Sequence, residues 1–126
     1  KILIYLFKIM KINYYKTDVL VPGLHKLNNF KFCEQDIFNM EKKYFNYFDV
    51  VRVTNLLNYS YFSRQKIKIA KFYLNKISKE NSIILINRTN DKKKNIASIF
   101  RKRNGKFELL EDINGGSEIK DIMLSL

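Results

Sequence analysis

The chain has 126 residues, 46% of them hydrophobic, including ten Phe and eight Tyr. This composition allows one domain with a buried core and excludes a disordered chain, because it can bury enough apolar surface to offset chain entropy. The net charge of +12 raises nucleic acid or an anionic membrane as partners. The charges are spread along the whole length, however. The densest cluster, Lys92 to Lys94 with Arg101 to Arg103, is typical of a solvated loop and an exposed strand face, so we do not expect nucleic acid as the partner.

The few thiol and imidazole groups also exclude function classes. Cys33 is the single cysteine and His25 the single histidine, so the sequence offers neither an internal disulfide nor a metal-binding cluster. A reducing, cytoplasmic setting fits this composition. The opening KILIYLFKIMKI is apolar for only about a dozen residues, too short to cross a bilayer core of about 30 Å. We therefore expect no membrane insertion.

The first half of the chain predicts successive strands that end in polar residues. After a segment with helical spacing at residues 2–10 comes INYYKTDVL, which mixes β-branched and aromatic residues and reaches Asp18 before a Pro-Gly turn. The run FKFCEQDIF also reads as a strand and ends at Asp36. The mostly apolar run DVVRVTN is typical of a parallel strand buried on both faces, and it ends at Asn55.

The middle of the chain predicts a helix and another buried strand. Ser63 can cap RQKIKIAKFYLNKIS, whose apolar face comprises Ile67, Ala70, Leu74 and Ile77. A turn at residues 79–81 then leads into the continuous apolar run SIILINR.

The last third predicts antiparallel structure. Asn104-Gly105 tolerates positive φ at both centres of a type I′ turn, so IFRKR and KFELLE should form a hairpin. A second break at residues 114–116 precedes SEIKDIML, which we interpret as a final strand.

Polar residues at the strand ends suggest a ligand site. Parallel strands joined through helices share one edge for their carboxyl ends, which is where open α/β sheets bind ligands. Asp18, Asp36 and Asn55 should therefore meet at one rim, where carboxylates can accept hydrogen bonds from ribose hydroxyls and an adenine amino group. Each residue alone is explained as well by the turn preference of Asp and Asn. Together they indicate a nucleoside site.

One segment resembles a known family. FDVVRVTNLLNYSYF, residues 48–62, is similar to the fourth-strand motif of class I S-adenosylmethionine-dependent methyltransferases, in the branch that includes the chemotaxis-receptor methyltransferases. The resemblance continues through the following helix, SIILINR, NGKFELL and GGSEI, and covers roughly residues 12–124. It implies an α/β fold with a Rossmann-like, mostly parallel sheet and an antiparallel C-terminal hairpin.

The resemblance also implies roles for single residues. Asp18 would hold the ribose of S-adenosylmethionine, Asp36 and Ile37 would contact the adenine, and Asn55 and Leu56 would line the methionine side. The reaction would be direct displacement at the sulfonium methyl toward an unidentified acceptor, which needs alignment and water exclusion and no covalent protein intermediate. The catalytic residues are not identified.

The sequence departs from the family in two places. Lys79-Glu80-Asn81 replaces the Pro-Gly-Gly turn that is common there, and no Gly-x-Gly occurs before Asp18 to approach the cofactor closely. We therefore expect residues 1–126 to be a single incomplete domain, the C-terminal two-thirds, lacking the first strand and its Gly-rich loop. Such a fragment should bind the cofactor weakly or not at all. A non-catalytic scaffold with the same sheet and a small basic nucleic-acid-binding protein remain alternatives.

Overall fold

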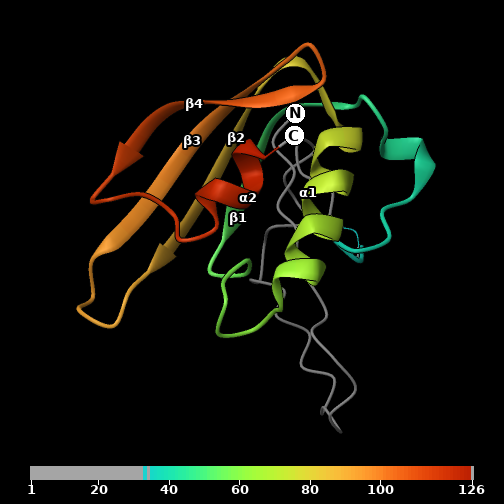
Figure 1. Ribbon diagram of the computed structural model, residues 1–126. Helices are drawn as coiled ribbons and strands as arrows, with labels where there is room; N and C mark the ends of the chain where they lie inside the picture. Colours follow the sequence, from blue (N-terminus) through green and yellow to red (C-terminus); the bar gives the residue numbers. More distant parts are fainter. Residues whose placement is uncertain (1–32, 34, 126) are drawn as a thin grey trace, which may run out of the picture.

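The computed structural model describes residue 33 and residues 35–125, which form a small α/β domain around one four-stranded sheet (Figure 1). Its elements in chain order are the short 3₁₀ helix η2 (Lys42–Tyr44), β1 (Phe48–Thr54), α1 (Arg64–Ile77), β2 (Ser78–Thr89), β3 (Asn95–Arg103), β4 (Lys106–Ile113) and α2 (Lys120–Leu124).

The described sheet is mixed, with strand order β1-β2-β3-β4. β1 and β2 are parallel and joined through α1, whereas β2, β3 and β4 follow one another as antiparallel neighbours. The expected α/β class and the antiparallel hairpin are thus confirmed. The described strands contain one parallel pair and two antiparallel pairs, so this part of the sheet is not mostly parallel.

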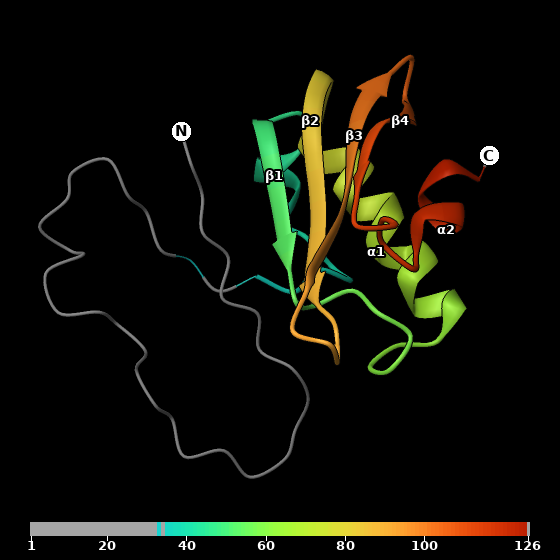
Figure 2. The ribbon, with the colours of Figure 1, turned by 90° about the vertical axis from the view of Figure 1, so that its left-hand side faces the viewer.

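The helices cover one face of the sheet, the far side in Figure 2. That face carries the alternate strand residues Val51, Val53, Ile84, Ile86 and Phe100, all at most 3% exposed. The opposite face leaves Val50 56% exposed, although the run around it had indicated a strand buried on both faces. No helix among the described residues has the length and apolar character to cross a membrane.

Helix α1 forms as its sequence predicts. The Ser63 hydroxyl accepts a hydrogen bond from the Lys66 backbone N–H at 3.4 Å, which caps the first turn. Residues spaced three and four apart are buried against the sheet, namely Ile67, Ala70, Leu74 and Ile77. At the other end the Lys102 ammonium donates to the carbonyls of Asn75 and Ser78 at 2.7 and 2.8 Å. This cation therefore satisfies acceptors that the helix terminus leaves open.

Several local predictions need correction. SEIKDIML does not form a strand, because Ile119, Ile122 and Met123 have helical spacing and are buried together, which places Lys120–Leu124 in α2. Residues 79–81 lie inside β2 as a bulge opposite β1, where Phe48 pairs with Ser78 and Val50 with Ile83. The basic run at residues 101–103 is not one exposed face, since strand alternation buries Lys102 to 7% exposure.

Candidate functional site

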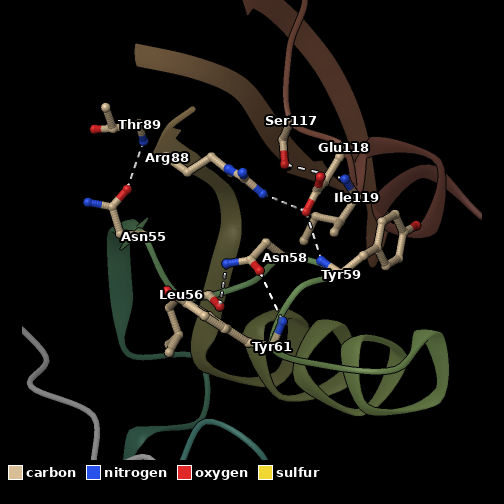
Figure 3. Close-up of polar contacts among 10 residues, drawn as sticks. All are labelled: Asn55, Leu56, Asn58, Tyr59, Tyr61, Arg88, Thr89, Ser117, Glu118 and Ile119. Atoms are coloured by element: carbon tan, nitrogen blue, oxygen red, sulfur yellow. Dashed lines mark hydrogen bonds and ion pairs between the residues drawn. The ribbon is translucent and has the colours of Figure 1, made fainter. Parts of the chain in front are cut away.

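The carboxyl end of β1 is defined by Asn55. This residue adopts φ of 53°, a left-handed conformation that Asn tolerates better than most residues. Its backbone N–H donates to the Asn87 carbonyl at 2.8 Å, and its side-chain Oδ1 accepts from the Thr89 N–H at 2.8 Å (Figure 3). The side chain thus extends the pairing with β2 beyond the last residue of β1. With Oδ1 engaged, the group left over is Nδ2, which can only donate.

The other expected site residues lie in different settings. Asp18 lies outside the described residues. Asp36 does not end a strand, since the described residues around it form a turn in which its Oδ1 accepts from the Phe38 N–H at 2.9 Å. A local side-chain turn of this kind competes with strand pairing, which is the physical reason that the expected strand end is absent there. Ile37 and Leu56 are buried at 3% and 6% exposure in the same hydrophobic core.

The loop after Asn55 is organised by Asn58. This side chain is 4% exposed, its Oδ1 accepts from the Tyr61 N–H at 3.1 Å, and its Nδ2 donates to the Leu56 carbonyl at 3.4 Å. The Asn58 carbonyl also accepts from the N–H groups of Tyr61 and Phe62. One buried amide therefore folds residues 56–62, hereafter the β1–α1 loop, into a compact turn that leaves Tyr61 61% exposed.

A glutamate from the C-terminal segment reaches this loop. The Glu118 Oε1 atom accepts from the Tyr59 backbone N–H at 2.7 Å and from the Arg88 guanidinium at 3.0 Å (Figure 3). The two side chains of the ion pair are only 19% (Arg88) and 33% (Glu118) exposed. Arg64 donates to the Tyr59 hydroxyl at 3.1 Å. These contacts bring together the β1–α1 loop, the end of β2 and the C-terminal segment.

The segment that carries Glu118 is itself anchored to the sheet. The Ser117 N–H donates to the Ser98 hydroxyl at 2.8 Å, and that hydroxyl donates to Asp112 Oδ1 at 2.6 Å. The second carboxylate oxygen of Asp112 accepts from Lys120 at 2.5 Å. The hydrogen bonds from Lys120 and Ser98 hold the pKa of Asp112 below its usual value. Gly116 passes close to the same carboxylate with φ of +81°.

Sequence reasoning did not single out Arg88, Asn58 or Glu118. Glu118 lies 59 residues from Tyr59 and 30 from Arg88, so no local pattern predicts these contacts. One signal was available: two successive glycines before Ser117 indicate a close backbone approach. Within residues 33 and 35–125, no three Cys, His, Asp or Glu side chains gather as metal ligands.

Comparison of the chain with protein-family models, with curated proteins and with solved structures finds no match. The fold and the site therefore define the chain only as a small α/β domain with a mixed sheet.

Proposed function

We propose that this chain is the rear part of a class I S-adenosylmethionine-dependent methyltransferase that transfers a methyl group to an unidentified acceptor. The observation that carries the proposal is the carboxyl end of β1. There Asn55 directly follows β1, the first strand of a parallel β1-α1-β2 unit, in the position where open α/β sheets bind ligands. The segment that resembles the methyltransferase motif continues from Asn55 into the β1–α1 loop.

The hydrogen bonding of Asn55 fits one part of the cofactor in particular. Because Thr89 fixes Oδ1 as the acceptor, Nδ2 is left as a donor at the end of the strand. A donor suits the carboxylate of the methionine moiety and does not suit its ammonium group. The side chain of Leu56 beside it is buried in the hydrophobic core, so it supports the strand end from inside and leaves little surface for a ligand. In this proposal the chain's own residues bind and orient the cofactor, and alignment with the acceptor accelerates the transfer.

The remaining cofactor contacts of the proposal are the ribose at Asp18 and the adenine at Asp36, whereas the side chain of Ile37 is buried in the core. The Gly-rich strand would precede this chain. The upstream reading frame should then encode a buried strand ending in a Gly-rich turn. In the full-length protein Asp18→Ala should abolish cofactor binding.

Asn55→Asp is the sharpest test of the site. Aspartate keeps an oxygen for the Thr89 N–H and tolerates the left-handed conformation, but it replaces the Nδ2 donor with a charged acceptor. Loss of a hydrogen bond to a charged group should weaken S-adenosylmethionine binding by about 10- to 100-fold in calorimetry of the full-length protein. Asn104→Asp is the matched control, since Asn104 has φ of 50° in the distant β3–β4 turn.

Two results would count against the proposal. Unchanged affinity in Asn55→Asp would remove this residue from the site. Full-length protein that does not bind S-adenosylmethionine would refute the methyltransferase proposal and favour the non-catalytic scaffold.

A further inference from the structure

The β1–α1 loop receives a contact from far along the chain. Asn58 closes the loop internally, but it does not fix the loop relative to the sheet. Leu56 and Leu57 pack the start of the loop into the hydrophobic core. The hydrogen-bonded connection further along the loop comes from Glu118, whose Oε1 joins the Tyr59 N–H to Arg88 in β2. A carboxylate shared by two donors in a partly buried setting makes strong, charge-assisted hydrogen bonds.

Glu118 is well suited to hold another segment because its own backbone is fixed on both sides. Ser117 is tied to the sheet through Ser98, and Ile119 is fully buried. The residues that follow, Ile122 and Met123, are also buried. The carboxylate is therefore presented from a preorganised segment, so little entropy is lost when it binds the loop.

From these contacts we propose that Glu118 is a positioning residue, which holds the β1–α1 loop at the carboxyl end of β1 in the arrangement that receives the cofactor. The part of this proposal that places a cofactor beside the loop rests on the proposed function. The contact between Glu118 and the loop does not depend on that function.

The first arm of the test concerns the loop alone and uses the 126-residue chain. In Glu118→Ala the amide hydrogen exchange of Tyr59 should accelerate by about tenfold or more, while amides in the middle of α1 and β2 keep their protection. In Glu118→Gln protection should be largely kept, because the side-chain amide oxygen can still accept from the Tyr59 N–H.

Glu108→Ala is the matched control. It also removes one carboxylate from an ion pair, the exposed Arg103–Glu108 contact at 3.8 Å, and should leave Tyr59 unaffected. Unchanged exchange in Glu118→Ala would overturn the inference. If Glu118→Ala does not fold, Glu118→Gln decides the question. A Glu118→Gln protein whose amides are all as unprotected as in the unfolded chain would also overturn the inference, because the contact would then be needed for folding rather than for holding the loop.

The second arm measures S-adenosylmethionine binding to the full-length protein. Glu118→Ala should weaken binding by about tenfold, and Glu118→Gln should restore most of it. If the loop loses protection while the affinity stays unchanged, Glu118 does not position the loop for the cofactor. If the unchanged full-length protein does not bind, the proposed function fails, while the exchange data still decide whether Glu118 holds the loop.

Discussion

Gly116 offers the most direct test of how the C-terminal segment is anchored. It has φ of +81°, and a Cβ atom placed on it would lie 2.3 Å from Asp112 Oδ1 and 2.6 Å from Cγ. The carboxylate cannot simply move aside, because Ser98 and Lys120 bind its two oxygens. Gly116→Ala must therefore break at least one of these hydrogen bonds or displace the turn.

Gly115→Ala separates backbone strain from the loss of an Asp112 hydrogen bond, which are the two causes by which Gly116→Ala should destabilise the fold. Gly115 has φ of +91° with no atom within 4 Å of an added Cβ, so Gly115→Ala should cost only the left-handed strain, about 1–2 kcal/mol. Gly116→Ala adds the loss of a hydrogen bond to a charged group, about 1.5–3 kcal/mol, and should cost about 2.5–5 kcal/mol in total.

Urea unfolding followed by circular dichroism measures both free energies. In an Asp112→Ala background the obstacle is gone, so adding Gly116→Ala should cost no more than the strain, about 1–2 kcal/mol. The reasoning would be refuted if Gly116→Ala destabilised no more than Gly115→Ala, or if its cost were the same with and without Asp112.

Three further changes test other contacts. Ser63→Ala should lower the free energy of unfolding by about 1 kcal/mol in urea titration, since it removes the cap of α1, whereas Ser63→Asp should preserve it. Lys102→Met should cost about 1–3 kcal/mol because two helix-end carbonyls lose their donor, and an unchanged urea midpoint would contradict that role. Since the folded pKa of Asp112 is lowered, its contribution is present above the unfolded pKa of about 3.9 and is lost as pH falls through the lower folded pKa. The stability difference between the unchanged protein and Asp112→Asn should therefore shrink on acidification below about pH 4, and a constant difference would count against this pairing.

The parts of the fold that were predictable from sequence are those set by local rules. The apolar spacing of α1 with its cap at Ser63, and the Asn104-Gly105 turn with φ of 50° and 72°, depend on residues within a few positions of each other. α2 was missed because SEIKDIML was interpreted as a strand, although the spacing of Ile119, Ile122 and Met123 has the period of a helix.

The candidate site could be predicted only in part, because its contacts join residues that are far apart in the sequence. Asn55 was identified because it ends an apolar run, but its bond to Thr89 depends on strand pairing across 34 residues. Asp36 also follows a strand-like run, yet its side chain accepts from the nearby Phe38 N–H, and the described residues around it form a turn. The same residue types thus end a strand or open a turn depending on partners that the local sequence does not specify.

The tests of Gly116 and Glu118 together ask whether the turn at Gly116 controls the position of the Glu118 carboxylate. Only one residue separates Gly116 from Glu118, and Ser117 between them is bonded to the sheet. If Gly116→Ala displaces this turn, the Glu118 carboxylate should withdraw from the Tyr59 N–H, so the Tyr59 amide should lose protection although the substitution lies far from it in sequence. Loss of stability without faster exchange at Tyr59 would show that Ser117 isolates Glu118 from the turn. Loss of both would show that the packing of the C-terminal segment controls the end of β1, and the cofactor affinity of the full-length protein should then fall in Gly116→Ala as it does in Glu118→Ala.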